Sequence, residues 1–578
     1  MKNMIRFFKV FKRILGARIY TLLALGVLAA FFEGLSISLF IPLLKADIHN
    51  PLKRFLDRLF SIAGMHPSFT FLLILIFVLF CLRTAVLILT AEREGKIMKG
   101  FLIAARRDIL EKIFQADYGY YLSRKIGYFN NALTMEIHNI SFLFKQFSTV
   151  MVSLLFLSVY LFLALLVDWK TILVLGIIAL FFMGVVRKLN AKISGYSIKT
   201  TKISGEFQSF LIQALSQFKY LKATGSFRRV FNKIFEQNNL LAQLFYDNRL
   251  YSAWGEYGFF PVVMLVISAI VYIHVALMGR PIVEVLFFLF LVKQVSDKLI
   301  TVQSNYRKLL NYQGSLFLFE KIEKELAEQM EISSVNKVAA IKESIVFRDV
   351  GFRHGDKLIL DNVNMEFHRG LMTGILGPLG AGKSTIFNLI AGLLKPSAGG
   401  IYLDGQSYAG LDFASLREKI GYVTQEDVIF HDTLLNNITL WDREKKKELD
   451  NLLNSMKERC GLDIWGEFMK TLPRGYDTVL GESGLKISGG QRGLIVFLRE
   501  LLKKPEILLL DEFSSAMDEG AELWALTFLA NTGRDRITIM ISHRLTAFKL
   551  CRPIYHLLNG KIIETHNNYE EFRKRHQI

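Results

Sequence analysis

The sequence predicts two domains: an N-terminal membrane domain made of α-helices, and a C-terminal α/β domain built around a phosphate-binding loop. The chain has 578 residues, which is too many for a single hydrophobic core. Hydrophobic residues make up 52% of the chain, and the mean hydropathy of +0.31 is typical of a membrane protein. The last long apolar run ends at residue 300, and the glycine-rich loop begins at Gly377.

The formal net charge of +19 does not by itself identify a partner. A basic chain can bind nucleic acid, but in a membrane protein lysine and arginine gather on cytoplasmic loops and at anionic headgroups. The apolar runs favour the second explanation, so we expect membrane lipids and no nucleic acid as partners. The three cysteines, Cys81, Cys460 and Cys551, are too far apart for a metal-binding motif.

Six apolar runs, at 20–44, 69–89, 147–167, 171–186, 259–277 and 281–300, approach the length of about 20 residues that crosses a bilayer. The first run follows a basic N-terminus but lacks a signal-peptide cleavage site, so we expect it to be retained. These runs predict six transmembrane helices.

The connections between the runs predict the orientation. The second-to-third and fourth-to-fifth connections are long and rich in lysine and arginine, which places them in the cytoplasm. Their amphipathic pattern predicts helices that extend the spans. The turns at Asp168 and Gly279 are short and would lie outside. The N-terminus and the C-terminal domain would then be cytoplasmic, with the protein in the cell's inner or plasma membrane.

A polar segment separates the two domains. From 325 to 344 the chain is charged and lacks tryptophan and phenylalanine, as a linker does. We therefore divide the chain into a membrane domain (1–324), a linker (325–344) and an α/β domain (345–578). Apolar segments at 345–352 and 365–367 predict antiparallel strands at the start of the α/β domain.

The glycine-rich loop fits the pattern G-x-x-x-x-G-K-[ST], which cradles nucleotide phosphates. A predicted strand at 372–376 precedes it and a predicted helix follows it, so the phosphates would sit at a helix N-terminus. Lys383 would contact the β- and γ-phosphates, and Ser384 would bind Mg²⁺. The loop consists of Gly377, Pro378, Leu379, Gly380, Ala381, Gly382, Lys383, Ser384 and Thr385.

Two adjacent carboxylates follow an apolar strand at 507–510. Asp511 is expected to hold Mg²⁺, and Glu512 is expected to polarise the water that attacks the γ-phosphate. Alone, the pair is a modest signal. Downstream of a phosphate-binding loop it predicts ATP hydrolysis.

Ionisable residues inside the predicted spans are candidates for a substrate cavity, because charge is costly in a bilayer. Glu33 lies in the first run and Arg83 in the second, and an ion pair between helices is the main alternative for both. Lys293, Asp297 and Lys298 lie at the inner end of the sixth run, where reaching towards the interface explains them equally well.

A third motif resembles the signature of the ABC transporter family, LSGGQ, with isoleucine in place of leucine: Ile487, Ser488, Gly489, Gly490 and Gln491. The family's Q-loop matches at Gln425 and its switch histidine at His543. Its D-loop matches at Ser515, Ala516, Met517 and Asp518. A segment just before the signature, with Glu482 and Ser483, is similar to one that the family's exporters place against their membrane helices.

The resemblance covers essentially the whole chain and implies an exporter-type half-transporter whose ATPase domain includes a helical subdomain. It implies that two chains pair head to tail, with each ATP held between one chain's loop and the other chain's signature. Because one chain carries one complete set of motifs, we expect a homodimer. Glu512 would be the catalytic base, His543 would contact the γ-phosphate, and Gln425 would sense Mg²⁺.

Two positions depart from the family pattern. Where the family usually stacks a tyrosine on adenine, this sequence has His354, whose ring is smaller, and Phe352 is the alternative candidate. After the signature, Gly493 and Leu494 replace residues that are often polar or basic in the family.

The first apolar run bears on the transported compound. The first run is similar to that of bacterial exporters that flip lipid-linked saccharides, so we expect an amphipathic lipid, a lipid-linked saccharide or a hydrophobic compound. A peptide or drug exporter and an ATP-gated channel or regulator are the alternatives. Intact Glu512 and His543 favour a pump over a gate.

Overall fold

The computed structural model describes residues 2–43, 58, 60–61, 68–258, 260–331, 336–461, 463–481, 484 and 486–576. The chain divides into two compact units, which we call the membrane unit (Met1–Ala116 and Tyr120–Met330) and the C-terminal unit (Asp117–Gly119 and Glu331–Ile578). The boundary at Glu331 falls inside the predicted linker. Residues 332–335 of that linker lie outside the described residues.

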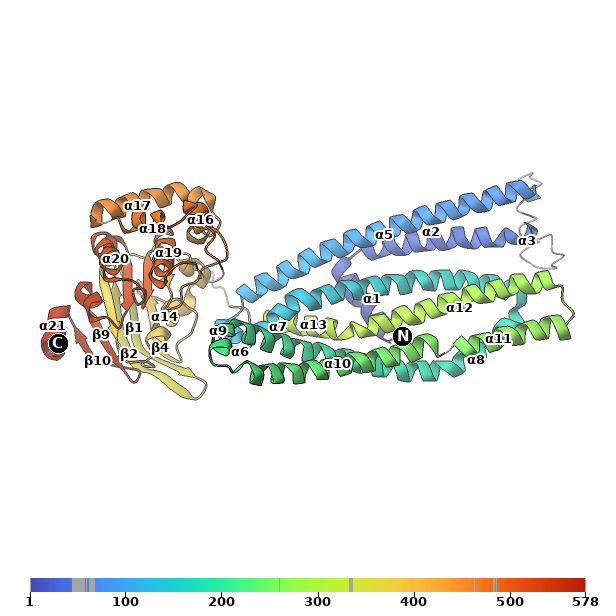
Figure 1. Ribbon diagram of the computed structural model, residues 1–578, viewed down its shortest axis with the longest axis horizontal. Coiled ribbons are helices and arrows are strands. Elements are labelled where there is room, and N and C mark those ends of the chain that lie inside the picture. The colour runs from blue at the N-terminus through green and yellow to red at the C-terminus, as the bar shows by residue number, and fades with distance from the viewer. Residues whose placement is uncertain are drawn as a thin grey trace. The chain divides into compact units, whose positions relative to one another are not determined.

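Helices form the membrane unit (Figure 1). They are α1 (Lys2–Leu15), α2 (Arg18–Ser38), α3 (Phe40–Leu43), α5 (Phe69–Phe114), α6 (Tyr118–Ser123), α7 (Ile126–Asn131), η1 (Ala132–Glu136), α8 (Ile137–Ser216), α9 (Phe218–Ala223), α10 (Phe227–Tyr257), α11 (Phe260–Val271), η2 (Tyr272–Leu277), α12 (Ile282–Asn311) and α13 (Gln313–Glu328). The predicted helical extensions are confirmed, because α5 continues well past residue 89, and α8 and α10 together fill most of the connection between the fourth and fifth runs.

Four helical stretches among the described residues are long and apolar enough to span a membrane: Arg18–Ser38, Phe69–Phe114, Ile126–Ile178 and Phe227–Leu277. The predicted run 171–186 continues α8 beyond Asp168, whose backbone is not helical (φ −151°, ψ 89°). The predicted run 281–300 lies in α12, which carries Glu284, Lys293 and Asp297. The count of six spans therefore stays a prediction.

The start of the predicted linker belongs to the helical packing of the membrane unit. The helix α13 continues to Glu328, and its Leu326 is fully buried. The polar composition of 325–344 concealed this, because α13 is amphipathic and buries only one of its faces.

The C-terminal unit contains two sheets. The first has the strand order β2 (Lys357–His368), β1 (Ser344–His354), β4 (Ala398–Leu403) and β5 (Gln406–Ser407). Ile345 pairs with Phe367 in antiparallel register, as predicted. The second has the order β10 (Lys561–His566), β9 (Ile554–Leu558), β3 (Met372–Leu376), β8 (Ile537–Ile541), β7 (Ile507–Asp511) and β6 (Ile420–Val423).

In the second sheet β10 is antiparallel to β9, and the pairs from β9 to β6 are all parallel. In such a sheet the carboxyl ends of the strands share one edge, and this edge is where α/β folds bind ligands. Both faces are covered, since β7 and β8 are buried along their whole length. The helices of this unit are α14 (Lys383–Ile390), α15 (Phe413–Arg417), α16 (Leu434–Thr439), α17 (Lys446–Cys460), α18 (Ile464–Lys470), α19 (Gly489–Leu502), α20 (Glu519–Thr532) and α21 (Tyr569–His576).

Candidate nucleotide site

The glycine-rich loop joins β3 to α14 at the carboxyl edge of the parallel sheet. Gly380 and Gly382 have φ values of 77° and 105°, which residues with a side chain rarely adopt. A Cβ atom on Gly377 would lie 2.2 Å from the carbonyl oxygen of Leu557. The loop can therefore bring its backbone N–H groups close to a ligand only because these positions are glycine.

Lys383 is folded back onto the loop that precedes it. Its Nζ donates to the carbonyl oxygens of Gly377 at 2.7 Å and Pro378 at 3.1 Å, and the residue is only 7% exposed. Burial lowers the pKa of this ammonium, opposed by the charges of Glu512 and Asp511. Phosphate oxygens would replace the carbonyl oxygens as partners of this cation.

Asp511 is the last residue of β7, and its carboxylate is buried. Burial and the negative charge of neighbouring Glu512 raise its pKa to about 6, while Lys383 and Ser384 act in the opposite direction. A carboxylate that is costly to ionise in the free protein gains from a cation placed beside it.

Two segments that are distant in the sequence converge on Glu512. Nε2 of His543 lies 2.9 Å from Oε1 of Glu512, and the amide Nε2 of Gln425 donates to Oε2 at 3.2 Å. The sheet explains this convergence: Asp511 pairs with Ile541 of β8, so Glu512 and His543 leave adjacent strands together. Gln425 follows β6, the next strand on the other side.

The signature motif begins α19. Ser488 caps the helix and forms a reciprocal capping box with Gln491, in which each side chain accepts from the other residue's backbone N–H. The D-loop packs on the signature glycines, since a Cβ on Gly489 would lie 3.0 Å from Cβ of Ala516. A Cβ on Gly490 would lie 2.9 Å from the carbonyl oxygen of Ala516. The signature and the D-loop of one chain thus hold each other in place.

Two D-loop side chains have structural tasks of their own. Met517 is buried, and a Cβ on Gly493 would lie 3.2 Å from its Cε atom. Asp518 caps α20 by accepting from the backbone N–H of Ala521 at 2.7 Å. Leu494 is 2% exposed in the same apolar core. Packing against the D-loop thus explains glycine at position 493, and burial in the apolar core explains leucine at position 494.

Arg544 is a residue of this site that no sequence pattern singled out. Its guanidinium donates to the carbonyl oxygens of Ser515 and Met517, each at 3.2 Å. It also forms an ion pair with Glu522 at 2.6 Å. Arg544 therefore ties the segment of the switch histidine to the D-loop. Its position directly after His543 was the only available signal.

The two adenine candidates differ in exposure. Phe352 is 8% exposed and packs in the core between the sheets. His354 lies at the exposed end of β1 and stays a prediction. Glu482 and Ser483 lie outside the described residues.

The charges predicted inside the spans are paired within the chain. Nε of Arg83 lies 2.7 Å from Oε2 of Glu33, and the hydroxyl of Tyr160 donates to the other oxygen of Glu33. The alternative of an ion pair between helices is therefore what the structure contains. Lys293 and Asp297 are 3.5 Å apart, one turn apart on α12, and half exposed or more. Nζ of Lys298 lies over the ring of Phe156.

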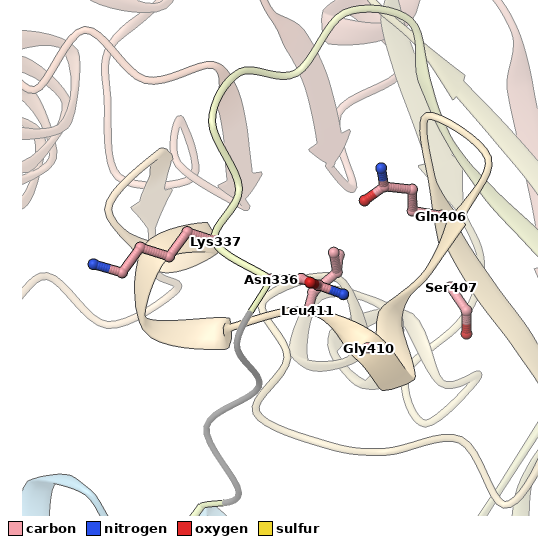
Figure 2. A pocket seen from close by; sticks show the side chains of 6 residues that line it. All are labelled: Asn336, Lys337, Gln406, Ser407, Gly410 and Leu411. Atoms are coloured by element: carbon pink, nitrogen blue, oxygen red, sulfur yellow. The ribbon is translucent and has the colours of Figure 1, made fainter.

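An open hollow of the C-terminal unit lies away from these motifs. Figure 2 shows its lining where the end of the linker meets the first sheet: Asn336, Lys337, Gln406, Ser407, Gly410 and Leu411. None of the motif residues lines it. We therefore assign the nucleotide site by the motif geometry and not by this hollow.

Comparisons with known proteins agree with both units. Two family models match the chain, "ABC transporter transmembrane region" at residues 17–298 and "ABC transporter" at residues 360–515. An ATP-dependent lipid A-core flippase of Desulfotalea psychrophila is 36% identical over 283 residues, which cover 49% of this chain and 47% of that protein. The chain thus aligns with about half the length of this relative.

Two further matches extend over most of the chain. The heterocyst differentiation ATP-binding protein HepA of a Nostoc species is 25% identical over 80% of this chain and 76% of that protein. A solved structure of a bacterial Atm1-family ABC exporter with ATP bound has a TM-score of 0.78 and 20% identity, over 98% of this chain and 97% of that one. At this identity the structural likeness establishes the fold alone.

Proposed function

This chain belongs to the ABC transporter family, and we propose that it is a half-transporter whose two copies use ATP hydrolysis to export or flip a substrate across the cell's inner or plasma membrane. The proposal rests chiefly on one observation. Gln425 and His543 converge on Glu512 beside the phosphate-binding loop, in a chain that also carries apolar helices of membrane-spanning length.

Glu512 is the group best placed to act on water. Its two oxygens are held by two side chains from neighbouring strand ends, which fixes the orientation of the carboxylate. A water next to it would be polarised for attack on the γ-phosphate. His543 would also be accessible to that phosphate, because 45% of its side chain is exposed.

The residues beside the loop suit Mg²⁺ bound together with ATP. No group of three or more His, Cys, Asp or Glu side chains among the described residues could hold a metal. Mg²⁺ in nucleotide sites typically uses one or two carboxylates, together with waters and the phosphates, instead of such a group. Ser384, Asp511 and Gln425 would hold the ion, which when bound neutralises charge on the phosphates.

A second copy of this chain would complete the site. The N-terminus of α19, with Ser488 exposed and Gly489 partly exposed, carries backbone N–H groups suited to an anion. We propose that it meets the γ-phosphate of ATP bound to the partner. The dimer would then close only while that phosphate is present, and hydrolysis would release it.

The substrate we propose is an amphipathic lipid, a lipid-linked saccharide or another hydrophobic compound. Two relatives whose names state a lipid substrate are 36% identical over part of this chain. The chain's own apolar helices and the ATPase motifs are consistent with such a pump.

The test is ATP hydrolysis by the full-length protein in liposomes. We expect Mg²⁺-dependent hydrolysis that candidate lipids stimulate, together with ATP-dependent movement of a labelled lipid between leaflets. Complete absence of hydrolysis in correctly folded protein would contradict the pump. Hydrolysis that accompanies ion conductance without lipid movement would favour the gated channel.

A further inference from the structure

A polar cavity of about 410 Å³ lies inside the membrane unit between α8, α10 and α12. Helix faces turned towards a bundle interior are apolar by default. Each of these three helices instead turns polar residues one turn apart towards the cavity. They are Thr200 and Ser204, Asn248 and Ser252, and Arg307 and Asn311.

Five polar atoms of this lining are buried without a hydrogen-bond partner among the described residues. They are Oε2 of Glu136, Oγ1 of Thr200, Oδ1 of Asn248, Oγ of Ser252 and Oδ1 of Asn311. Buried polar atoms are nearly always paired, so five around one cavity indicate that something else satisfies them. Two of them are amide oxygens and one is a carboxylate oxygen, so the missing partner must donate hydrogen bonds.

The cavity also presents donors. Arg307 is 3% exposed, and it donates to the carbonyl oxygen of Gly255. A Cβ at position 255 would lie 2.9 Å from its NH1 atom, so glycine makes room for the guanidinium. Arg307 has more donors than this one carbonyl uses. Phe245 and Tyr312 contribute aromatic rings to the same lining.

We infer that this cavity binds a hydroxyl-rich, saccharide-like headgroup of the transported compound. Hydroxyl groups both donate and accept, which matches a lining with unpaired amide oxygens, unpaired hydroxyls and a guanidinium. The lining segments lie on the cytoplasmic side of the predicted spans, where a substrate would enter before export. The inference rests on the proposed function, because it assumes that the membrane unit takes up a substrate.

The experiment measures equilibrium binding to the full-length protein in nanodiscs without ATP. Three probes distinguish recognition of the sugar from recognition of the alkyl chain. They are dodecyl maltoside below its critical micelle concentration, free maltose, and a dodecyl polyoxyethylene ether with the same alkyl chain and no sugar. We expect dodecyl maltoside to bind at least tenfold more tightly than the ether. Binding of free maltose with equal affinity would place all recognition in the sugar and support the inference equally.

Variants locate the binding. We expect the double change Asn248→Ala and Asn311→Ala to weaken dodecyl maltoside at least tenfold, and the nearly isosteric Thr200→Val to weaken it severalfold. The matched control is Asn239→Ala, an exposed asparagine on the same helix α10, which should leave affinity within twofold. Three outcomes would overturn the inference and show that water alone fills the cavity. They are equal binding of the ether and dodecyl maltoside, no binding of either sugar-bearing probe, and unchanged affinity for dodecyl maltoside in both cavity variants.

Binding and hydrolysis are measured separately, so the cavity assignment and the proposed pump can fail independently. Binding without ATP does not depend on hydrolysis, so a protein that binds maltoside but hydrolyses no ATP contradicts only the pump. A protein that hydrolyses ATP and transports lipid but shows no preference for the sugar contradicts only the cavity assignment.

Discussion

Both units bury carboxylates, but they satisfy them in different ways. In the membrane unit, Glu33 is paired with Arg83 and accepts from Tyr160. In the C-terminal unit, Asp511 and Glu512 are adjacent, burial raises the pKa of Asp511, and the ammonium of Lys383 is held by backbone carbonyl oxygens. The first cluster is complete within the chain, whereas the second would become balanced on binding a cation and phosphates, as proposed above.

The comparison shows that buried charge alone does not mark a functional site. A paired charge can stabilise helix packing without contacting any substrate, while incomplete pairing is costly in the free protein and useful on binding. The polar cavity of the membrane unit belongs to the second kind, because several of its buried atoms have no partner among the described residues. Four predictions test this distinction, from the largest expected effect to the smallest.

Replacing Glu512 by glutamine should lower the ATP hydrolysis rate by about 10²- to 10⁴-fold, because it removes the carboxylate that we propose activates water. Nucleotide binding should persist, since the amide keeps the same shape. Phosphate release and ATP affinity are the two measurements. Glu444→Gln, an exposed carboxylate of the same unit, serves as the control. Near-normal hydrolysis in Glu512→Gln would mean that the catalytic base lies elsewhere.

Replacing Glu33 by alanine should lower the free energy of unfolding by about 2–3 kcal/mol, because it leaves the Arg83 guanidinium, which is only 25% exposed, without its partner. The control is Glu92→Ala, which breaks an exposed pair with Lys96 on α5 and should cost at most about 1 kcal/mol. Thermal unfolding in detergent measures both. Unchanged stability combined with lost transport would mean that Glu33 contacts the substrate and that its pair with Arg83 does not stabilise the fold.

Replacing Asp511 by asparagine should stabilise the nucleotide-free protein while abolishing hydrolysis. The folded pKa is raised to about 6, above the value of about 3.9 expected in the unfolded chain. The ionised form therefore destabilises the fold above pH 6, and this cost disappears as the pH falls towards 4. The gain should be of the order of 1 kcal/mol at pH 8 and close to zero at pH 4.

Thermal unfolding without nucleotide at both pH values measures this gain. Asp535→Asn, an exposed aspartate, should show no such pH-dependent gain. A destabilised Asp511→Asn at pH 8 would mean that this carboxylate is already satisfied, as in the membrane cluster.

Replacing His354 by alanine should weaken ATP binding about two- to tenfold, the range expected for loss of one aromatic stacking contact. His354→Tyr should tighten binding because its ring offers more area. Fluorescent-nucleotide titration gives both constants. His368→Ala, an exposed histidine on the neighbouring strand β2, should leave them unchanged. Equal affinity in all variants would remove His354 from the site.

The nucleotide motifs were predictable because their requirements are local. Positive φ angles at Gly380 and Gly382 and the capping box from Ser488 to Gln491 depend on residues a few positions apart. Each therefore leaves a pattern in a short stretch of sequence. The parallel strands were likewise predictable from short apolar runs that end at the site.

Other features depended on pairings between distant segments. The burial of Phe352 was not predictable, because β1 has register shifts near it, and such bulges break the alternation that tells which face of the sheet a side chain takes. Arg544 contacts the D-loop only because α20 and the β8 end meet in space. The last residues of the amphipathic α13, from 325 to 328, likewise looked like a linker in composition.

By itself, then, the sequence determined that this protein binds a nucleoside triphosphate and that it carries a helical membrane domain, since both follow from local backbone chemistry and run length. The tertiary structure decided which charges are satisfied. Whether Glu33 is free or paired, and whether polar turns of α8, α10 and α12 face solvent or one cavity, depends on how helices far apart in the chain rotate against each other. No spacing within one segment encodes that rotation.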